Sequence, residues 1–207
     1  MKKLRVLVGC EYSQVVTLAF RNRGHDAFSC DLLPTEGNPD WHFQEDIFEV
    51  IKREQPFDIG IFHPPCTYLC SSGMHWTTRG LRDPQLTEDA LEFVRSLLDA
   101  PIPKIALENP IGCISTRIRK PDQILQPWQY GHPETKATCL WLKNLPLLKP
   151  TNIVNGREQR IWKMPPSKDR WKIRSTTYKG IGAAMASQWS DDCSSSDVVQ
   201  PELPLFV

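Results

Sequence analysis

Two short apolar segments in this sequence each lead to a side chain that can take part in covalent chemistry. Residues 58–66 end in the thiol of Cys66, and residues 104–110 contain the carboxyl of Glu108. Because ligands bind at the carboxyl ends of the strands in a parallel α/β sheet, two adjacent strands would bring this thiol and this carboxyl into one crevice. A thiolate adds to an electrophilic carbon, and a carboxylic acid can protonate a ring nitrogen. The pair is therefore suited to covalent attack on a pyrimidine.

Strand-like and helix-like segments alternate along most of the chain. Short apolar runs predict strands at residues 4–9, 25–31, 57–62, 105–108 and 137–142. Apolar periodicity and stop signals predict helices at residues 13–23, 48–53, 87–98 and 181–189. Thr87 is the expected N-cap of the third helix, and residues 63–83 and 111–128 are expected to be irregular. This alternation predicts an α/β fold with a doubly wound, mostly parallel sheet.

The composition suits one domain in a reducing compartment. The 207 residues predict a domain at residues 1–190 and a polar, flexible tail at residues 191–207. The 25 basic residues nearly balance the 24 acidic ones, so nucleic-acid binding would need a local basic face. The seven cysteines have no framework spacing, and no apolar run is long enough for a signal peptide or a membrane span. We therefore expect a cytoplasmic monomer with no membrane partner.

Several motifs, in their order along the chain, resemble those of the cytosine-C5 DNA methyltransferase family. Pro65-Cys66 matches the family's Pro-Cys motif, and Glu108-Asn109-Pro110 matches its Glu-Asn-Val motif with one change. Residues 130–138 resemble the segment in which a Gln and two Arg residues organise the active site. The three corresponding positions here are Glu134, Lys136 and Thr138. The resemblance implies a fold of the S-adenosylmethionine-dependent methyltransferase type and methyl transfer to cytosine C5 in DNA.

The resemblance also implies a role for each catalytic residue. The thiolate of Cys66 would add to C6 of cytosine and so make C5 nucleophilic. The carboxyl of Glu108 would bond N3 and the exocyclic amine, while Asn109 would shape the loop and Lys136 would take one of the organising positions. The target base would have to leave the duplex stack.

A cofactor site for S-adenosylmethionine is implied by motifs near the N-terminus. The turn after the first strand corresponds to the family's glycine-rich turn, although Glu11 and Tyr12 stand where the family has further glycines. Asp31, at the end of the second strand, suits a ribose hydroxyl, and residues 181–184 resemble the motif that closes the pocket. The implied cofactor contacts are Gly9, Cys10, Glu11, Asp31, Asp46, Ile47 and Pro64.

Residues 143–180 take the place of the family's long target-recognition region. Arginines, lysines and tryptophans alternate in this segment, a mixture that suits phosphate contact and base stacking. The expected substrate contacts are Thr138, Arg157 and Arg160. The segment is too short to predict a long recognition sequence.

The C-terminal tail resembles the peptide by which bacterial proteins bind the β sliding clamp. Gln200 precedes Leu203, Leu205 and Phe206, in the order of that motif's glutamine and apolar anchors. A bacterial or phage-infected cell is therefore the expected setting, with DNA and the β sliding clamp as partners.

Other interpretations of these residues stay open at this point. Cys66 is also consistent with a buried structural thiol, and the basic segment with a solvated surface. His63, Cys66, Cys70 and His75 have a loose zinc-like spacing, but no metal is expected. The alternative functions are modification of a free pyrimidine nucleotide, and clamp and DNA binding by a catalytically idle protein of this fold.

Overall fold

A computed structural model describes residues 2–195 and has a seven-stranded sheet in this range. The strands lie in the order β3-β2-β1-β4-β5-β7-β6, and those from β3 to β5 are parallel to their neighbours. Their bounds are β1 Arg5–Gly9, β2 Asp26–Cys30, β3 His42–Phe43, β4 Ile59–Phe62, β5 Lys104–Pro110, β6 Gln123–Leu125 and β7 Thr138–Lys143.

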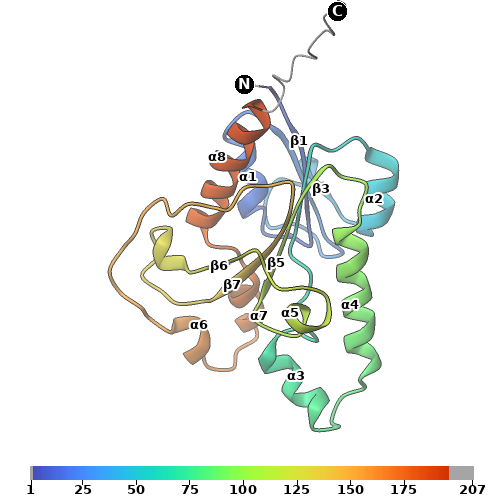
Figure 1. Ribbon diagram of the computed structural model, residues 1–207, viewed down its shortest axis with the longest axis vertical. Helices are drawn as coiled ribbons and strands as arrows, with labels where there is room; N and C mark the ends of the chain where they lie inside the picture. The colour runs from blue at the N-terminus through green and yellow to red at the C-terminus, as the bar shows by residue number, and fades with distance from the viewer. Residues whose placement is uncertain (1, 196–207) are drawn as a thin grey trace, which may run out of the picture.

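Helices cover both faces of this sheet (Figure 1). Helices α1 (Val15–Arg21) and α8 (Lys179–Ser195) pack on one face, and α2 (Ile47–Glu54) and α4 (Gln85–Leu98) on the other. Successive side chains of β1 alternate between the two layers: Val6 and Val8 join the first core, and Leu7 joins the second. Because both faces are buried, the central strands are apolar throughout. The predicted α/β class, with a doubly wound, mostly parallel sheet, is confirmed.

The last two strands run against the others. β7 pairs antiparallel with β5 and with β6, and Thr138 lies opposite Pro110 in the first of these pairs. Because β7 begins where β5 ends, the residues just before it reach the carboxyl edge of the sheet. Lys136 is thereby placed beside the end of β5, although it is distant from that strand in the sequence.

Several segments expected to be irregular have regular structure. Residues 63–83 contain α3 (Ser71–Thr78), and residues 111–128 contain α5 (Ile114–Arg117) and β6. α3 carries no buried residue and little apolar periodicity, so its sequence gives no helical signal. Its first residue is bound to residues 111–113 through the Ser71 amide and the Ile111 carbonyl (3.1 Å), and the turn before it approaches so closely that a Cβ on Gly112 would lie 2.0 Å from the Leu69 carbonyl oxygen. Short 3-10 turns occur at Pro39–Trp41 and Pro127–Gln129.

Two other expectations need correction or extension. α4 begins at Gln85 after Pro84, so Thr87 is not its N-cap; Thr87 is buried. Residues 143–180 contain α6 (Arg160–Lys163) and α7 (Arg170–Ser175), and α8 continues past residue 190 to Ser195. The predicted clamp-binding residues Gln200, Leu203, Leu205 and Phe206 lie outside the described residues. Among the helices that are described, none is both long and apolar enough to cross a membrane.

Candidate active site

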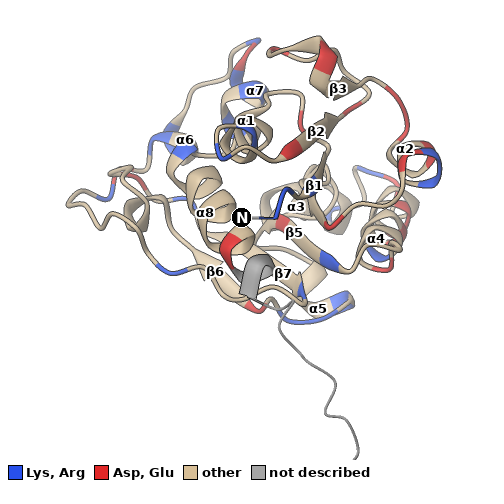
Figure 2. Cartoon of the chain, turned by 90° about the horizontal axis from the view of Figure 1, so that it is seen from above, with Lys and Arg blue, Asp and Glu red and all other residues tan. Residues whose placement is uncertain are grey.

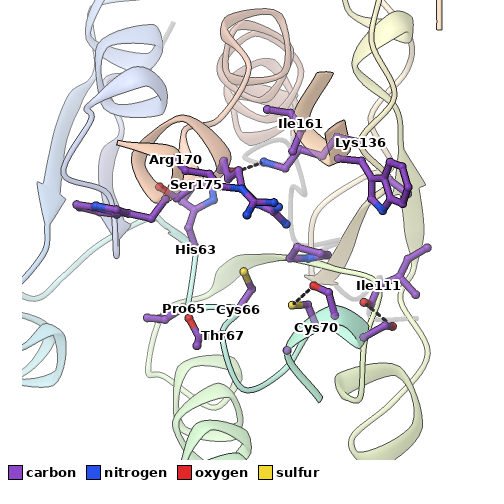
Figure 3. Close-up of a pocket in the computed structure, with 18 of the residues that line it drawn as sticks. His63, Pro65, Cys66, Thr67, Cys70, Ile111, Lys136, Ile161, Arg170 and Ser175 are labelled. Carbon is purple, nitrogen blue, oxygen red and sulfur yellow. Dashed lines mark hydrogen bonds between the residues drawn. The ribbon is translucent and has the colours of Figure 1, made fainter. Parts of the chain in front are cut away.

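A cleft of about 1360 Å³ opens at the carboxyl ends of β1, β2, β4 and β5. The loop after β4 forms one wall with His63, Pro65 and Cys66, and the segments before β7 and around α7 form the opposite wall (Figure 3). The position agrees with the rule that ligands of such sheets bind beyond the strand carboxyl ends.

Cys66 lies in the loop after β4 and begins a turn that leads into α3. Its carbonyl accepts hydrogen bonds from the amides of Leu69 (3.1 Å) and Cys70 (2.9 Å). This turn brings the thiols of Cys66 and Cys70 together on the cleft wall (Figure 3). The hydrogen bond with Cys70, and then burial, raise the pKa of Cys66; the Glu108 carboxylate raises it further, and the Lys136 ammonium opposes the shift.

The interaction between the two thiols raises the pKa of Cys66 and lowers that of Cys70, which favours ionisation of Cys70 before Cys66. The hydrogen bond from Cys66 is the main cause that lowers the pKa of Cys70 to about 5, against the opposing effect of burial. The Ser72 hydroxyl, 3.3 Å from the Cys70 sulfur, the Gly73 amide and the Arg174 charge also stabilise the thiolate. Cys70 is the N-cap of α3, where the helix dipole favours a negative charge. The direction of these effects favours the thiolate form of Cys70.

Glu108 projects from β5 and is bound by His63. The Nδ1 atom of His63 lies 3.0 Å from Oε2 of Glu108, and both side chains are largely buried. Burial raises the pKa of Glu108, but the hydrogen bond and charge of His63, with the charge of Lys136, outweigh burial and lower it overall. Glu108 is therefore a carboxylate at neutral pH in the unliganded site.

Asn109 ties the two catalytic strands together. Its side chain is 1% exposed, and its Nδ2 donates a 2.8 Å hydrogen bond to the carbonyl of Pro64. The bond joins β5 to the loop that carries Cys66. The structure thus gives Asn109 the loop-shaping contact that the sequence predicts.

Lys136 completes this group of residues. Its ammonium donates a 2.8 Å hydrogen bond to the carbonyl of Arg174, and its charge acts on both Cys66 and Glu108. The structure therefore brings together all four predicted catalytic residues, Cys66, Glu108, Asn109 and Lys136.

Two of the predicted cofactor residues line the far end of the cleft. Cys10 follows β1 with a left-handed backbone (φ 59°), and Asp31 follows β2. Asp31 accepts a 2.9 Å hydrogen bond from the Leu33 amide through Oδ1. Burial, and then the nearby Asp31 carboxylate, raise the pKa of the Cys10 thiol, so the thiol stays neutral. A carboxylate at the second strand end suits the ribose hydroxyls of a nucleoside cofactor.

The other predicted cofactor residues do not line this cleft. Gly9 is required by packing, because an added Cβ would lie 2.8 Å from side-chain carbons of Ile47 and Phe62. Ile47 belongs to the core, and Asp46 caps α2 by accepting from the Phe48 amide at 2.8 Å. Pro64 is buried and bonded through its carbonyl. Their cofactor contacts stay predictions.

Glu11 and Tyr12, which stand where the family that the sequence resembles has glycines, both make structural contacts here. Glu11 is 4% exposed and accepts from the Val16 amide at 2.6 Å and the Thr17 hydroxyl at 2.7 Å, so its carboxylate serves the start of α1. Tyr12 lines the cleft, its hydroxyl lies 3.3 Å from the Ser175 hydroxyl, and its ring centroid lies 5.6 Å from that of Trp171. Because its carboxylate is engaged, Glu11 could contact a cofactor only through its backbone. The sequence did not predict that Tyr12 contacts α7; the one feature that could have indicated it is the position of Tyr12 next to the turn after β1.

The predicted substrate residues are engaged elsewhere in the fold. Arg157 stacks over Trp128 at 3.8 Å, and Arg160 pairs with Glu134 at 2.8 Å. Thr138 is 4% exposed, and its hydroxyl donates to the Lys136 carbonyl. None of these three residues lines the cleft.

Other basic and aromatic side chains line the cleft instead. They come from α3, α6, α7 and the connections between them, and they are Arg82, Arg170, Arg174, Trp76, Trp162 and Trp171. The tryptophans expose between 49% and 76% of their surface. Figure 2 shows basic residues on α6 and α7. The mixture that the sequence predicts for base and phosphate contact is therefore present, with different members.

No metal cluster is found in the part of the chain that the structure describes. No three His, Cys, Asp or Glu side chains within residues 2–195 gather in a way that could hold an ion. Of the residues with zinc-like spacing, His63 instead pairs with Glu108, and Cys70 contacts Ser72.

Comparison with known proteins gives a likeness of fold. No protein-family model matches the chain, and no curated protein sequence matches it. Among the solved structures that it resembles are a prophage-encoded E. coli protein assigned as a DNA modification methyltransferase (TM-score 0.46, 16% identity), the S. pombe Dnmt2 methyltransferase (0.47, 14%) and the Entamoeba histolytica methyltransferase EhMeth (0.47, 15%). These alignments cover 79%, 78% and 78% of this chain but only 56%, 54% and 59% of the other chains. The chain thus spans little more than half the length of each.

Proposed function

We propose that this protein is an S-adenosylmethionine-dependent DNA cytosine-C5 methyltransferase. The observation that carries the proposal is the convergence of Cys66 and Glu108 from adjacent strand ends, close enough for the Glu108 charge to act on the Cys66 thiol, with the Lys136 charge acting on both. A nucleophile and a proton-sharing carboxyl are the two groups that covalent activation of cytosine needs.

Cys66 would act as the nucleophile, and Cys70 would accept its proton. As the Cys66 sulfur bonds to C6 of the ring, its proton passes to the Cys70 thiolate, which lies within hydrogen-bonding reach. The electron pair of the C5–C6 double bond shifts through the conjugated ring toward N3. Because Glu108 is a carboxylate in the empty site, it would take up a proton from solvent as the base binds and share that proton with N3. C5 then carries enamine character and takes the methyl group. Loss of the C5 proton to solvent water re-forms the C5–C6 double bond and expels the Cys66 thiolate, and N3 returns its proton to Glu108.

S-adenosylmethionine fits the far end of the cleft. Asp31 would hold the ribose hydroxyls, and the turn at Cys10 would face the rest of the nucleoside. When bound, the cofactor supplies an electrophilic methyl group on a sulfonium. Tyr12 and Trp171 would cover this end, since they join the turn after β1 to α7.

DNA is the substrate that the cleft walls favour. Arg170 and Arg174 would meet phosphates, and Trp162 and Trp171 would stack on unpaired bases. A flipped cytosine needs such surfaces to replace the stacking that it loses in the duplex.

Mass spectrometry of nucleosides tests this proposal. Plasmid DNA is incubated with the protein and S-adenosylmethionine, digested and analysed, with free dCTP and dCMP incubated in parallel. We expect 5-methylcytosine in the DNA sample with wild-type protein, none with Cys66→Ser, and near-normal amounts with Cys113→Ser, a thiol outside the cleft. Methylation of the free nucleotides alone would favour the nucleotide enzyme, and no product in either would favour a catalytically idle protein.

A further inference from the structure

His63 lies in the site with a hydrogen bond to Glu108 and within electrostatic range of Glu11. Its side chain is 8% exposed, its Nδ1 lies 3.0 Å from Glu108, and it lines the cleft beside Cys66 (Figure 3). The buried carboxylate of Glu11 acts on it from the side of α1.

The position of the ring hydrogen follows from the partner of each nitrogen. Glu108 is a carboxylate, which only accepts hydrogen bonds, so Nδ1 must carry the hydrogen. Nε2 is buried and has no hydrogen-bond partner among the described residues. The hydrogen bond therefore places a hydrogen on Nδ1 of His63.

The hydrogen bond from His63 engages one oxygen of the Glu108 carboxylate and leaves the other for a ligand. Oε2 is occupied by His63, and no contact fixes Oε1 within the described residues. The other titratable groups facing Glu108 are Lys136 before β7, Cys66 after β4 and Cys139 on β7. Lys136 donates to the Arg174 carbonyl, and among the described residues no hydrogen bond from Lys136, Cys66 or Cys139 to the Glu108 carboxylate is found.

We propose that His63 is a positioning residue that fixes the carboxyl of Glu108 through Oε2 and presents Oε1 to the ring of the target base. It holds the carboxyl in one orientation, so that the proton shared with the ring nitrogen lies in line as Cys66 adds. His63 itself makes and breaks no bond to carbon. That the ligand is a cytosine rests on the proposed function.

Three variants separate the hydrogen bond from the volume of the side chain. His63→Asn keeps a donor near the Nδ1 position, His63→Gln moves the donor toward the Nε2 position, and His63→Phe keeps the ring without a donor. The Glu108 carboxyl pKa is measured by carbon-13 NMR on protein labelled in glutamate, with the signal assigned by Glu108→Gln. Nitrogen-15 shifts of His63 report its tautomer.

We expect the Nδ1-protonated tautomer in wild type and a higher Glu108 pKa in His63→Phe and His63→Gln than in His63→Asn. We expect kcat to fall about 10²-fold in His63→Phe and His63→Gln, the cost of a small misplacement of a catalytic group. KM for DNA should change little, and His63→Asn should recover most of kcat.

Two results would overturn the proposal. One is an equal Glu108 pKa in wild type, His63→Gln and His63→Phe, and it counts whether or not the protein methylates DNA. The other is equal kcat in His63→Asn and His63→Gln. The protein could show the expected His63 tautomer and the expected order of Glu108 pKa values among the variants, yet no methylation. That result would contradict the proposed function, while His63 would still be the residue that fixes the orientation of the Glu108 carboxyl.

Discussion

Asn109 gives the sharpest prediction about how the catalytic loop is held. Its Nδ2–Pro64 carbonyl bond is 2.8 Å long and buried, and it joins β5 to the loop of Cys66. Asn109→Ala leaves that carbonyl without its donor, which costs about 1–3 kcal/mol. Oδ1 of Asn109 has no partner among the described residues, so its removal offsets part of this loss. We expect the free energy of unfolding to fall by about 1–2 kcal/mol.

Asn109→Asp is the matched variant, because it keeps the shape but exchanges the donor for an acceptor. At pH 8 the new carboxylate would be buried against the Pro64 carbonyl, so the protein should be less stable than Asn109→Ala. Burial raises the pKa of the introduced carboxyl above its unfolded value. Its protonated form can donate to Pro64, so the deficit relative to wild type should shrink as pH falls toward 5.

Urea denaturation of the three proteins at pH 8 and pH 5 measures these differences. Cys66 should also become more accessible to alkylation in Asn109→Ala, because its loop is less restrained. If Asn109→Ala is as stable as wild type, or if Asn109→Asp is no worse than Asn109→Ala at pH 8, the bond does not hold the loop.

Three further predictions concern other parts of the chain. The rate of Cys70 alkylation by iodoacetamide should have its pH midpoint near 5. The variant Cys66→Ala should raise this midpoint, because the hydrogen bond from Cys66 is lost. A wild-type midpoint near the ordinary thiol value of about 8.5 would contradict the lowered pKa of Cys70. Asp31→Ala should weaken S-adenosylmethionine binding by about 1–3 kcal/mol in calorimetry, and an unchanged affinity would exclude the ribose contact. A synthetic peptide of residues 200–206 should bind the bacterial β sliding clamp, and the double change Leu205→Ala with Phe206→Ala should abolish binding; equal binding by both peptides would refute the tethering role.

The central sheet and the meeting of Cys66 with Glu108 were predictable because their signals are local. Short apolar runs between turn residues mark β1, β4 and β5, Cys66 lies in the loop that follows β4, and Glu108 lies near the end of β5. The carboxyl-end rule then places Cys66 and Glu108 together without further information. Pairing of β7 against β5 was not visible in the sequence, since it depends on contacts between distant segments.

The residues around the ligand were harder to predict, because their partners are distant in sequence. Arg157 and Arg160 look like free basic residues but are engaged by Trp128 and Glu134, whereas Arg174 reaches the cleft through α7. α3 escaped prediction because it has no apolar face to give a periodic pattern.

The role of His63 also depends on distant partners. In the sequence, His63 has only a loose zinc-like spacing to other residues and no metal is expected; the meeting of two strand ends reveals its carboxylate partner. Gly9 resembles a cofactor-binding glycine, yet packing against Ile47 and Phe62 already requires it.

Trapping of a covalent intermediate tests the account most directly. Duplex DNA containing 5-fluorocytosine is incubated with the protein and S-adenosylmethionine, and the adduct is mapped by peptide mass spectrometry; fluorine at C5 prevents the final elimination. We predict an adduct on Cys66 in wild type, a slower adduct on the same residue in Cys70→Ser, and none in Cys66→Ser. An adduct that maps to Cys70, or that persists in Cys66→Ser, would contradict the assignment of Cys66 as the nucleophile.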